Sequence, residues 1–527
     1  MNRRVALIGF DGAESELVAR GIGEGWLPGI RRLAARGRTA LLDPEGMPFP
    51  SAAWTTAITG TPPEEHLLLL PQQLRPASYL IQPVGPAAAR RPPFWVQASG
   101  AGIRSTIVGA RAVPFVSGLR GTQVLGWGHP PAEAPHERQV VEPRELTTVV
   151  HAIAGRKPPR LPSGAVRSLQ GIGRETARLI SSARRHGWLL REMARRTEWE
   201  FVFGSFGEAH VGGHLLWNAD HADGFADSRS PLTRIYRAID AELHELARAL
   251  PQDTLLFVFT PHGMAANPNP SDPIGPVLER GGWLVRRRRD RVPMADPKLR
   301  AWQRARRLGR TVVPLSLRRR FWRDVAPASW IERRDRAASL AAAASIDWSA
   351  TRAFALPGDV VSHVRINLAG REPEGIVRPG AEYRSLCHEL ASGLQRLVDA
   401  ESGRRVVRRV VIVEDLIGLP VEDVLPDVVV EWIPGHSVRR IASPACGEIE
   451  VPSGDPRTGN HRPPGFLVVT DLAAADATPH GVTTWPGEAP HASILDVAPS
   501  VLRALGITSP EGLGGRPIEG LALDHHR

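Results

Sequence analysis

Short apolar runs alternate with amphipathic segments along most of the chain. The runs with the length and composition of buried strands are VALIGF, STIVGA, FVFGSF, TLLFVFT, HVRINL, VVIV, DVVVEW and GFLVVT. Between them, the pattern predicts helices at residues 27–36, 230–250, 382–399 and 493–505. Strands that alternate with helices predict an α/β fold, with a mostly parallel central sheet and helices on both of its faces.

Two regions depart from this alternation and are interpreted as insertions in a single domain over residues 1–527. Residues 71–200 are rich in Pro, Arg and Ala, form a variable insertion and include a predicted helix at 175–196. Residues 283–345 contain RRRRDR, RARRLGR and LRRRFWRD, and are expected to form an Arg-rich cap or lid. A solvated surface and a surface for peripheral contact with a membrane or another polyanion both fit this composition.

The charge balance favours anionic partners. The chain has 66 Lys and Arg against 55 Asp and Glu, a formal net charge of +11. Such an excess suits phosphoesters, membrane surfaces or nucleic acid, and composition alone does not choose among them. No motif indicates a specific nucleic-acid partner, so we predict none.

Cysteine usage and the N-terminal sequence bear on the compartment. Cys387 and Cys446 have no CxxC spacing, which excludes a disulfide framework and a thiolate zinc site. The apolar run that precedes Asp11 is short enough to be a first strand rather than a signal peptide, and no run approaches the roughly 20 apolar residues of a membrane span. We therefore predict a cytoplasmic protein without a transmembrane segment.

Ionisable side chains stand beside the first and third of these strands. Asp11 follows the first strand, in GFDGAE. An aspartate at this position can act as a metal ligand, as a helix cap or as a turn residue. His210 and His214 are four residues apart in FGEAHVGGHLLW, with Glu208 just before them. One helical turn would place both imidazoles on one face, within reach of one metal ion.

Two more histidines complete the pattern. His262 follows the TLLFVFT strand, and His461 lies in GNHRPPGFLVV, a Gly/Pro-rich loop before another strand. Four histidines and one aspartate, each beside the end of a strand, predict a metal site at one edge of the sheet.

Longer segments carry a family resemblance. They are ALIGFDGAESELV with GWLPGIRRLAARG, AAWTTAITGTPPEEH, PLTRIYRAIDAEL before the strand that leads to His262, INLAGREPEGIV, PDVVVEW and HASILDVAPSVLRALGI. In these segments the chain resembles the alkaline phosphatase superfamily, in its type I phosphodiesterase and nucleotide pyrophosphatase branch, especially bacterial proteins described as predicted phosphohydrolases or phosphomutases. The resemblance implies an alkaline-phosphatase-like fold and does not cover the two insertions.

The resemblance also implies two divalent metal ions, commonly zinc, and a Ser or Thr nucleophile that attacks phosphorus. Asp11, His214, His262 and His461 match ligand positions of the family directly. His210 stands where the family has an Asp. Imidazole can replace a carboxylate at zinc, and the neighbouring glutamate is the alternative ligand.

Pro261 stands where the family's DHGM motif has its Asp, and proline has no ligating side chain. We expect one firm metal site, for zinc or alternatively manganese, and leave a second site open. The family's nucleophile position falls at Pro50, and Ser51 is the adjacent hydroxyl. Ser51 is therefore the candidate nucleophile, with a role as N-cap of a helix beginning at Ala52 as the alternative. Trp54 is expected to pack near the site as a core aromatic residue.

These observations predict a metal-dependent hydrolase of phosphoric esters that acts through Ser51 on an anionic phosphoester, either a small molecule or a conjugate. The alternative is a catalytically degenerate binding or regulatory protein on the same scaffold, which the loss of a carboxylate at Pro261 favours.

Overall fold

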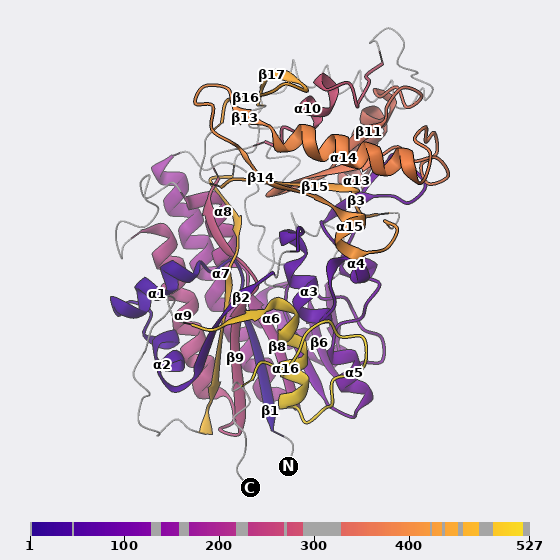
Figure 1. Cartoon of the computed structure of the whole chain (residues 1–527). Coiled ribbons are helices and arrows are strands. Elements are labelled where there is room, and N and C mark those ends of the chain that lie inside the picture. The colour runs from indigo at the N-terminus through magenta and orange to yellow at the C-terminus, as the bar shows by residue number, and fades with distance from the viewer. Residues whose placement is uncertain are drawn as a thin grey trace. The chain divides into compact units, whose positions relative to one another are not determined.

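The computed structural model describes residues 3–44, 47–127, 139–156, 168–217, 230–267, 271–287, 328–421, 424–434, 438–451, 457–473 and 489–519. The chain divides into two compact units (Figure 1). Each unit has its own hydrophobic core. Unit 1 comprises Met1–Leu69, Gly85–Asn267 and Pro456–Arg527, and unit 2 comprises Leu70–Val84 and Pro268–Asp455. Residues 288–327 of the predicted Arg-rich cap lie outside the described residues, and the single domain with two insertions stays a prediction.

Unit 1 is built on a nine-stranded sheet. Its strands in spatial order are β20 (His491–Ser493), β2 (Arg38–Asp43), β19 (Gly465–Asp471), β9 (Thr254–Thr260), β1 (Arg4–Phe10), β8 (Phe201–Phe206), β5 (Ser105–Val108), β6 (Gly121–Leu125) and β7 (Val140–Glu142). The central run from β9 to β6 is parallel, whereas β19 is antiparallel to both of its neighbours and β7 is antiparallel to β6. The predicted α/β class with a mostly parallel sheet is confirmed.

Both faces of this sheet are buried, which explains the continuous apolar runs. Alternate residues of β1 point to opposite faces, so Ala6, Ile8 and Phe10 belong to one core and Val5 and Leu7 to the other. The helices against the first core are α1 (Ser15–Gly23), α2 (Pro28–Arg36), α6 (Thr147–Ala154), α7 (Leu169–Arg196), α8 (Glu208–Leu216) and α9 (Pro231–Ala249). The helices against the second core are α3 (Ala53–Thr59), α5 (Trp95–Gly100) and α16 (Val497–Ala504).

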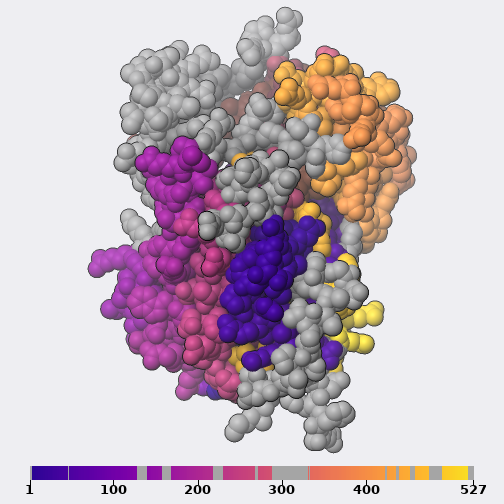
Figure 2. All heavy atoms as spheres, turned by 90° about the vertical axis from the view of Figure 1, so that its left-hand side faces the viewer, coloured from indigo at the N-terminus to yellow at the C-terminus, as the bar shows by residue number. Residues whose placement is uncertain are grey.

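The long helices of the first core pack on one another. Helix α9 contacts both α2 and α7, and Figure 2 shows the indigo N-terminal residues beside the pink residues that include α9. Asp240 of α9 accepts hydrogen bonds from the backbone N–H groups of Gly29 and Ile30, at 2.8 and 2.7 Å. It thereby satisfies two donors at the start of α2, whose N-cap residue Leu27 makes no side-chain cap.

Short elements complete unit 1. They are η1 (Pro50–Ala52), α4 (Pro63–His66), η2 (Pro86–Ala88), η3 (Arg144–Leu146), η8 (Ile494–Asp496), and the antiparallel pair β10 (Gly263–Ala266) and β18 (Gly459–Arg462). The register of β10 and β18 pairs Met264 with His461. This pairing joins the segment after β9 to a segment about 200 residues further along the chain.

Unit 2 has a four-stranded antiparallel sheet in the order β11 (Ala353–Leu356), β12 (Val361–Ile366), β15 (Val428–Trp432) and β14 (Val407–Ile412). Its helices are α10 (Ile274–Arg280), α13 (Ala328–Ala344), α14 (Ala381–Gln395) and α15 (Val413–Ile417). The small strands are β3 (Gln72–Leu74), β4 (Ile81–Pro83), β13 (Val398–Asp399), β16 (Arg440–Ser443) and β17 (Gly447–Glu450). Within the described residues, no helix is long and apolar enough to cross a membrane.

The structure refines the predicted elements in two places. The runs HVRINL, VVIV and DVVVEW are strands, but they build the antiparallel sheet of unit 2 rather than the central parallel sheet. The helix predicted at 382–399 ends at Gln395, because Val398 and Asp399 pair with β16.

Candidate metal centre

Four adjacent parallel strands carry ionisable residues just beyond their carboxyl ends. In the order β9, β1, β8 and β5, these residues are His262, Asp11, His210 and Arg111. Because the carboxyl ends of parallel strands meet at one edge of the sheet, residues distant in sequence gather there. The structure therefore brings Asp11, His210, His214, His262 and His461 together, and their role as metal ligands stays a prediction.

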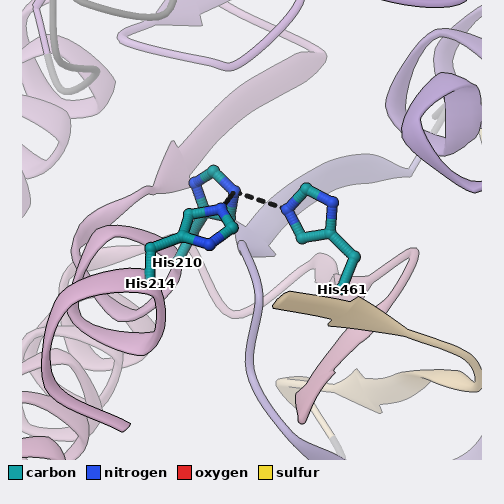
Figure 3. Close-up of side chains that lie close together, drawn as sticks. All are labelled: His210, His214 and His461. Carbon is teal, nitrogen blue, oxygen red and sulfur yellow. Dashed lines mark hydrogen bonds between the residues drawn. The ribbon is translucent and has the colours of Figure 1, made fainter. Parts of the chain in front are cut away.

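Three of the imidazoles point at one another (Figure 3). Nε2 of His210 lies 2.7 Å from Nε2 of His461 and 3.0 Å from Nε2 of His214. His210 and His214 lie one turn apart on α8, and His461 comes from β18. The group is buried or nearly so and has the ligand spacing of a metal site.

These three residues fit a zinc ion. Zn–N bonds of about 2.0–2.1 Å in tetrahedral geometry separate two nitrogens by about 3.3 Å, a few tenths of an ångström more than the observed contacts. Nδ1 of His214 lies 2.8 Å from the carbonyl oxygen of Gly459 and donates to it, which leaves the lone pair on Nε2. Burial first, and then the Arg111 guanidinium, hold the pKa of His210 well below its ordinary value, so this imidazole is neutral, as a ligand must be.

Asp11 is fully buried beside this triad. Its Oδ1 accepts a hydrogen bond of 2.7 Å from Nε1 of Trp54, and its Oδ2 accepts one of 3.0 Å from Nη1 of Arg111. Nδ1 of His210 lies 3.5 Å from Oδ2, and Nε2 of His262 lies 3.6 Å from Oδ1. Trp54 packs near the site as expected and also donates directly to the carboxylate.

His262 stands against the same group. Its ring centroid is 4.3 Å from that of His461, and burial, followed by the neighbouring His461, lowers the pKa of His262 to about 3. The preceding Pro261 occupies the connection between β9 and β10. No carboxylate is supplied from that position.

Glu208 is the other acidic residue on α8. Its Oε1 accepts a hydrogen bond of 2.7 Å from Ser182, and its Oε2 accepts none from the part of the chain that the structure describes. Burial raises the pKa of Glu208 to about 7. The convergent nitrogen atoms make His210, rather than Glu208, the third member of the triad in this arrangement.

Ser51 lies within η1, which precedes α3 directly and lies against β18, the strand that carries His461. The N-cap position of α3 is occupied by Ala52 rather than by Ser51. One turn further along the same helical stretch, Trp54 hydrogen-bonds to Asp11. The segment that carries the serine thus contacts the site at β18 and, through Trp54, at Asp11. The role of Ser51 as nucleophile stays a prediction.

Arg111 and Glu14 were not singled out from the sequence. Arg111 follows the predicted strand STIVGA by one residue, so the rule that selected Asp11 could also have selected it. Glu14 is buried, accepts from the Met264 backbone N–H at 2.9 Å and pairs with Arg462 at 2.8 Å. Only the tertiary structure shows this link, which ties the segment after Asp11 to β10 and β18.

Comparisons with known proteins bear on this arrangement. A family model described as type I phosphodiesterase / nucleotide pyrophosphatase matches residues 5–365. Among curated proteins, none matches the chain.

Solved structures that are similar to this chain include phosphonoacetate hydrolase from Sinorhizobium meliloti 1021 (13% identity, TM-score 0.47, 96% of each chain covered). Murine ectonucleotide pyrophosphatase / phosphodiesterase 5 has 12% identity and a TM-score of 0.41, with 96% of each chain covered. A mutant of the alkaline phosphatase PafA has 11% identity and a TM-score of 0.49, covering 98% of this chain and 99% of the other.

Proposed function

The chain belongs to the type I phosphodiesterase / nucleotide pyrophosphatase family, and we propose that it is a metal-dependent hydrolase of phosphoric esters that acts through Ser51. Family membership confirms the predicted class of enzyme, a hydrolase of phosphoric ester bonds. The observation that carries the finer proposal is the convergence of three Nε2 atoms, at 2.7 and 3.0 Å, beside the buried carboxylate of Asp11.

In this proposal His210, His214 and His461 hold the metal ion, and Asp11 and His262 stand beside it. Zinc is the first candidate and manganese the second, because a set of imidazoles suits zinc best. A bound divalent ion supplies positive charge for the phosphoryl oxygens. The buried, neutral imidazoles keep that charge largely uncompensated, which favours an anionic substrate.

The Ser51 hydroxyl supplies the nucleophile. Its Oγ forms a bond to phosphorus while the bond from phosphorus to the leaving oxygen breaks, and the leaving alcohol takes up a proton. Water then cleaves the seryl phosphoester, which releases the phosphate product and restores the hydroxyl. The position of η1 against β18 supports this role, because it holds the serine's segment next to the strand that carries His461.

The first test is metal content by elemental analysis, for the wild type and for His214→Ala. We expect the wild type to retain zinc through dialysis and His214→Ala to lose most of it. His388→Ala removes an exposed histidine of α14 and should leave the metal content unchanged. Protein that holds no metal after incubation with zinc and with manganese would refute the catalytic proposal.

The second test separates the nucleophile from the metal. Ser51→Ala should retain the metal and lose hydrolysis of bis-p-nitrophenyl phosphate by at least about a hundredfold, since it removes the attacking oxygen. Ser385→Ala, at an exposed position on α14, is the matched control. Undiminished hydrolysis by Ser51→Ala would show that another group attacks phosphorus.

The alternative is a catalytically degenerate binding or regulatory protein. The observation in its favour is Pro261, which provides no ligand at the end of β9. A metal-bound wild type that binds phosphate and hydrolyses neither phosphomonoesters nor phosphodiesters would support this alternative.

A further inference from the structure

Arg111 lies between two members of the site. Its Nη1 atom is 3.0 Å from Oδ2 of Asp11 and 3.0 Å from Nδ1 of His210. The side chain is 21% exposed, whereas that of Asp11 is fully buried. One permanent positive charge therefore lies on the buried carboxylate, and part of the Arg111 side chain is exposed.

The Arg111 backbone is held in place by its surroundings. Its N–H donates to Oγ of Ser205 at 2.9 Å, and the N–H of Gly109 donates to the carbonyl oxygen of Val124 at 2.8 Å. Gly109 and Ala112 flank it with φ of +55° and +57°. A left-handed conformation at alanine is strained and persists only where the surroundings enforce it, as is common near functional sites.

A second cation beside Asp11 would lack carboxylate ligands. Glu14 is engaged with Met264 and Arg462, and position 261 is proline. Glu208 binds Ser182 through Oε1 and does not belong to the group of ligand atoms that converge at the site. The Arg111 guanidinium already lies on Oδ2 of Asp11 and would repel a dication at that place. The charge that a second metal would bring is thus supplied by the side chain of Arg111.

We propose that Arg111 takes the place of a second metal ion, so that the site binds one metal and the guanidinium binds the phosphoryl oxygens of the substrate. This inference rests on the proposed function. A guanidinium suits the role because it is always charged and offers planar pairs of N–H donors that match two phosphoryl oxygens. No proton leaves Arg111, which acts by binding and orienting the group that Ser51 attacks.

The test measures zinc equivalents per chain and the affinity for inorganic phosphate. We expect one equivalent in the wild type and in Arg111→Met, with phosphate bound at least about 30-fold more weakly by Arg111→Met. Arg120→Met removes an exposed arginine of the same β5–β6 connection and should alter neither quantity. Arg111→Lys keeps the positive charge but lacks the planar pairs of N–H donors, and its affinity for phosphate should fall by an intermediate amount.

A gain-of-metal design completes the test. Pro261→Asp alone should still bind one equivalent, because the guanidinium remains, whereas Pro261→Asp combined with Arg111→Met should bind a second. Two equivalents of zinc per wild-type chain would overturn the inference, and this measurement needs no variant. Unchanged phosphate affinity in a folded Arg111→Met would also overturn it. A wild type without any metal would refute the proposed function itself, so the two failures are distinguishable.

Discussion

Glu14 offers a sharp test of how the site is held together. Its carboxylate accepts the backbone N–H of Met264 at 2.9 Å and pairs with Arg462 at 2.8 Å. Met264 pairs in turn with His461, and Arg462 is the next residue. Glu14→Ala removes a single side chain that joins the segment after β1 to both strands of the β10–β18 pair.

The cost can be built from three contacts. A buried N–H left without an acceptor costs about 1–3 kcal/mol, and Met264 is fully buried. The Arg462 pair contributes at most about 1 kcal/mol, because that side chain is 36% exposed and also contacts Glu16 at 3.0 Å. Glu14 is also the N-cap of α1, with a long contact of 3.5 Å to the Glu16 N–H, which adds a few tenths of a kcal/mol. The sum is about 1–4 kcal/mol.

Hydrogen exchange followed by mass spectrometry measures this cost locally, which avoids assuming that a chain of two units unfolds in one step. At 1.4 kcal/mol per tenfold, the amide of Met264 should exchange about 5- to 700-fold faster in Glu14→Ala. Glu14→Gln keeps an acceptor oxygen and should show a smaller increase. Glu16→Ala, at an exposed residue that also contacts Arg462, should change the rate less than about threefold.

Glu14→Ala should also retain less zinc, because His461 lies in the same pair of strands as Met264. Unchanged exchange at Met264 in a folded Glu14→Ala would refute the view that Glu14 clamps these segments. Faster exchange without any loss of zinc would restrict its role to stability.

Three further predictions concern the scaffold. Asp240→Ala leaves the N–H groups of Gly29 and Ile30 without their acceptor. In urea denaturation, this variant should lower the free energy of unfolding of unit 1 by about 2–4 kcal/mol. Asp240→Asn keeps one acceptor oxygen and should lower that free energy by about half as much. A Cβ at Gly109 would lie 2.3 Å from the Trp127 carbonyl oxygen, so Gly109→Ala should lower the melting temperature clearly more than Gly118→Ala, which has φ of +73° and open space around it. Burial raises the pKa of Asp272 to about 6 from its ordinary value near 3.8, so the folded state holds this proton more tightly than the unfolded state. The stability of unit 2 should therefore fall by about 3 kcal/mol in total as the pH rises from below 4 to above 6, and about 2 kcal/mol of this loss falls between pH 4.5 and 7.5. Urea titrations at these two pH values should show that Asp272→Asn abolishes the difference.

The sequence by itself determined the local elements and the candidate residues. The eight apolar runs are strands and the amphipathic segments are helices, because burial on two faces or on one stripe imposes a period that is visible in one dimension. Asp11, His210, His214 and His262 were found because each follows a strand in the chain, and parallel strands bring such positions to one edge. The family resemblance rests on these same segments, and the match over residues 5–365 confirms it.

The tertiary structure alone decided which elements pair and which side chains meet. The run GFLVVT joins the central sheet antiparallel, while HVRINL, VVIV and DVVVEW leave it for unit 2, because strand partners are chosen by contacts between distant residues. His461 reaches the other histidines only through the pairing of β18 with β10. Arg111 and Glu14 acquire their importance from partners that lie 99 or more positions away in the chain, and no local pattern of hydrophobic and polar residues encodes such a contact.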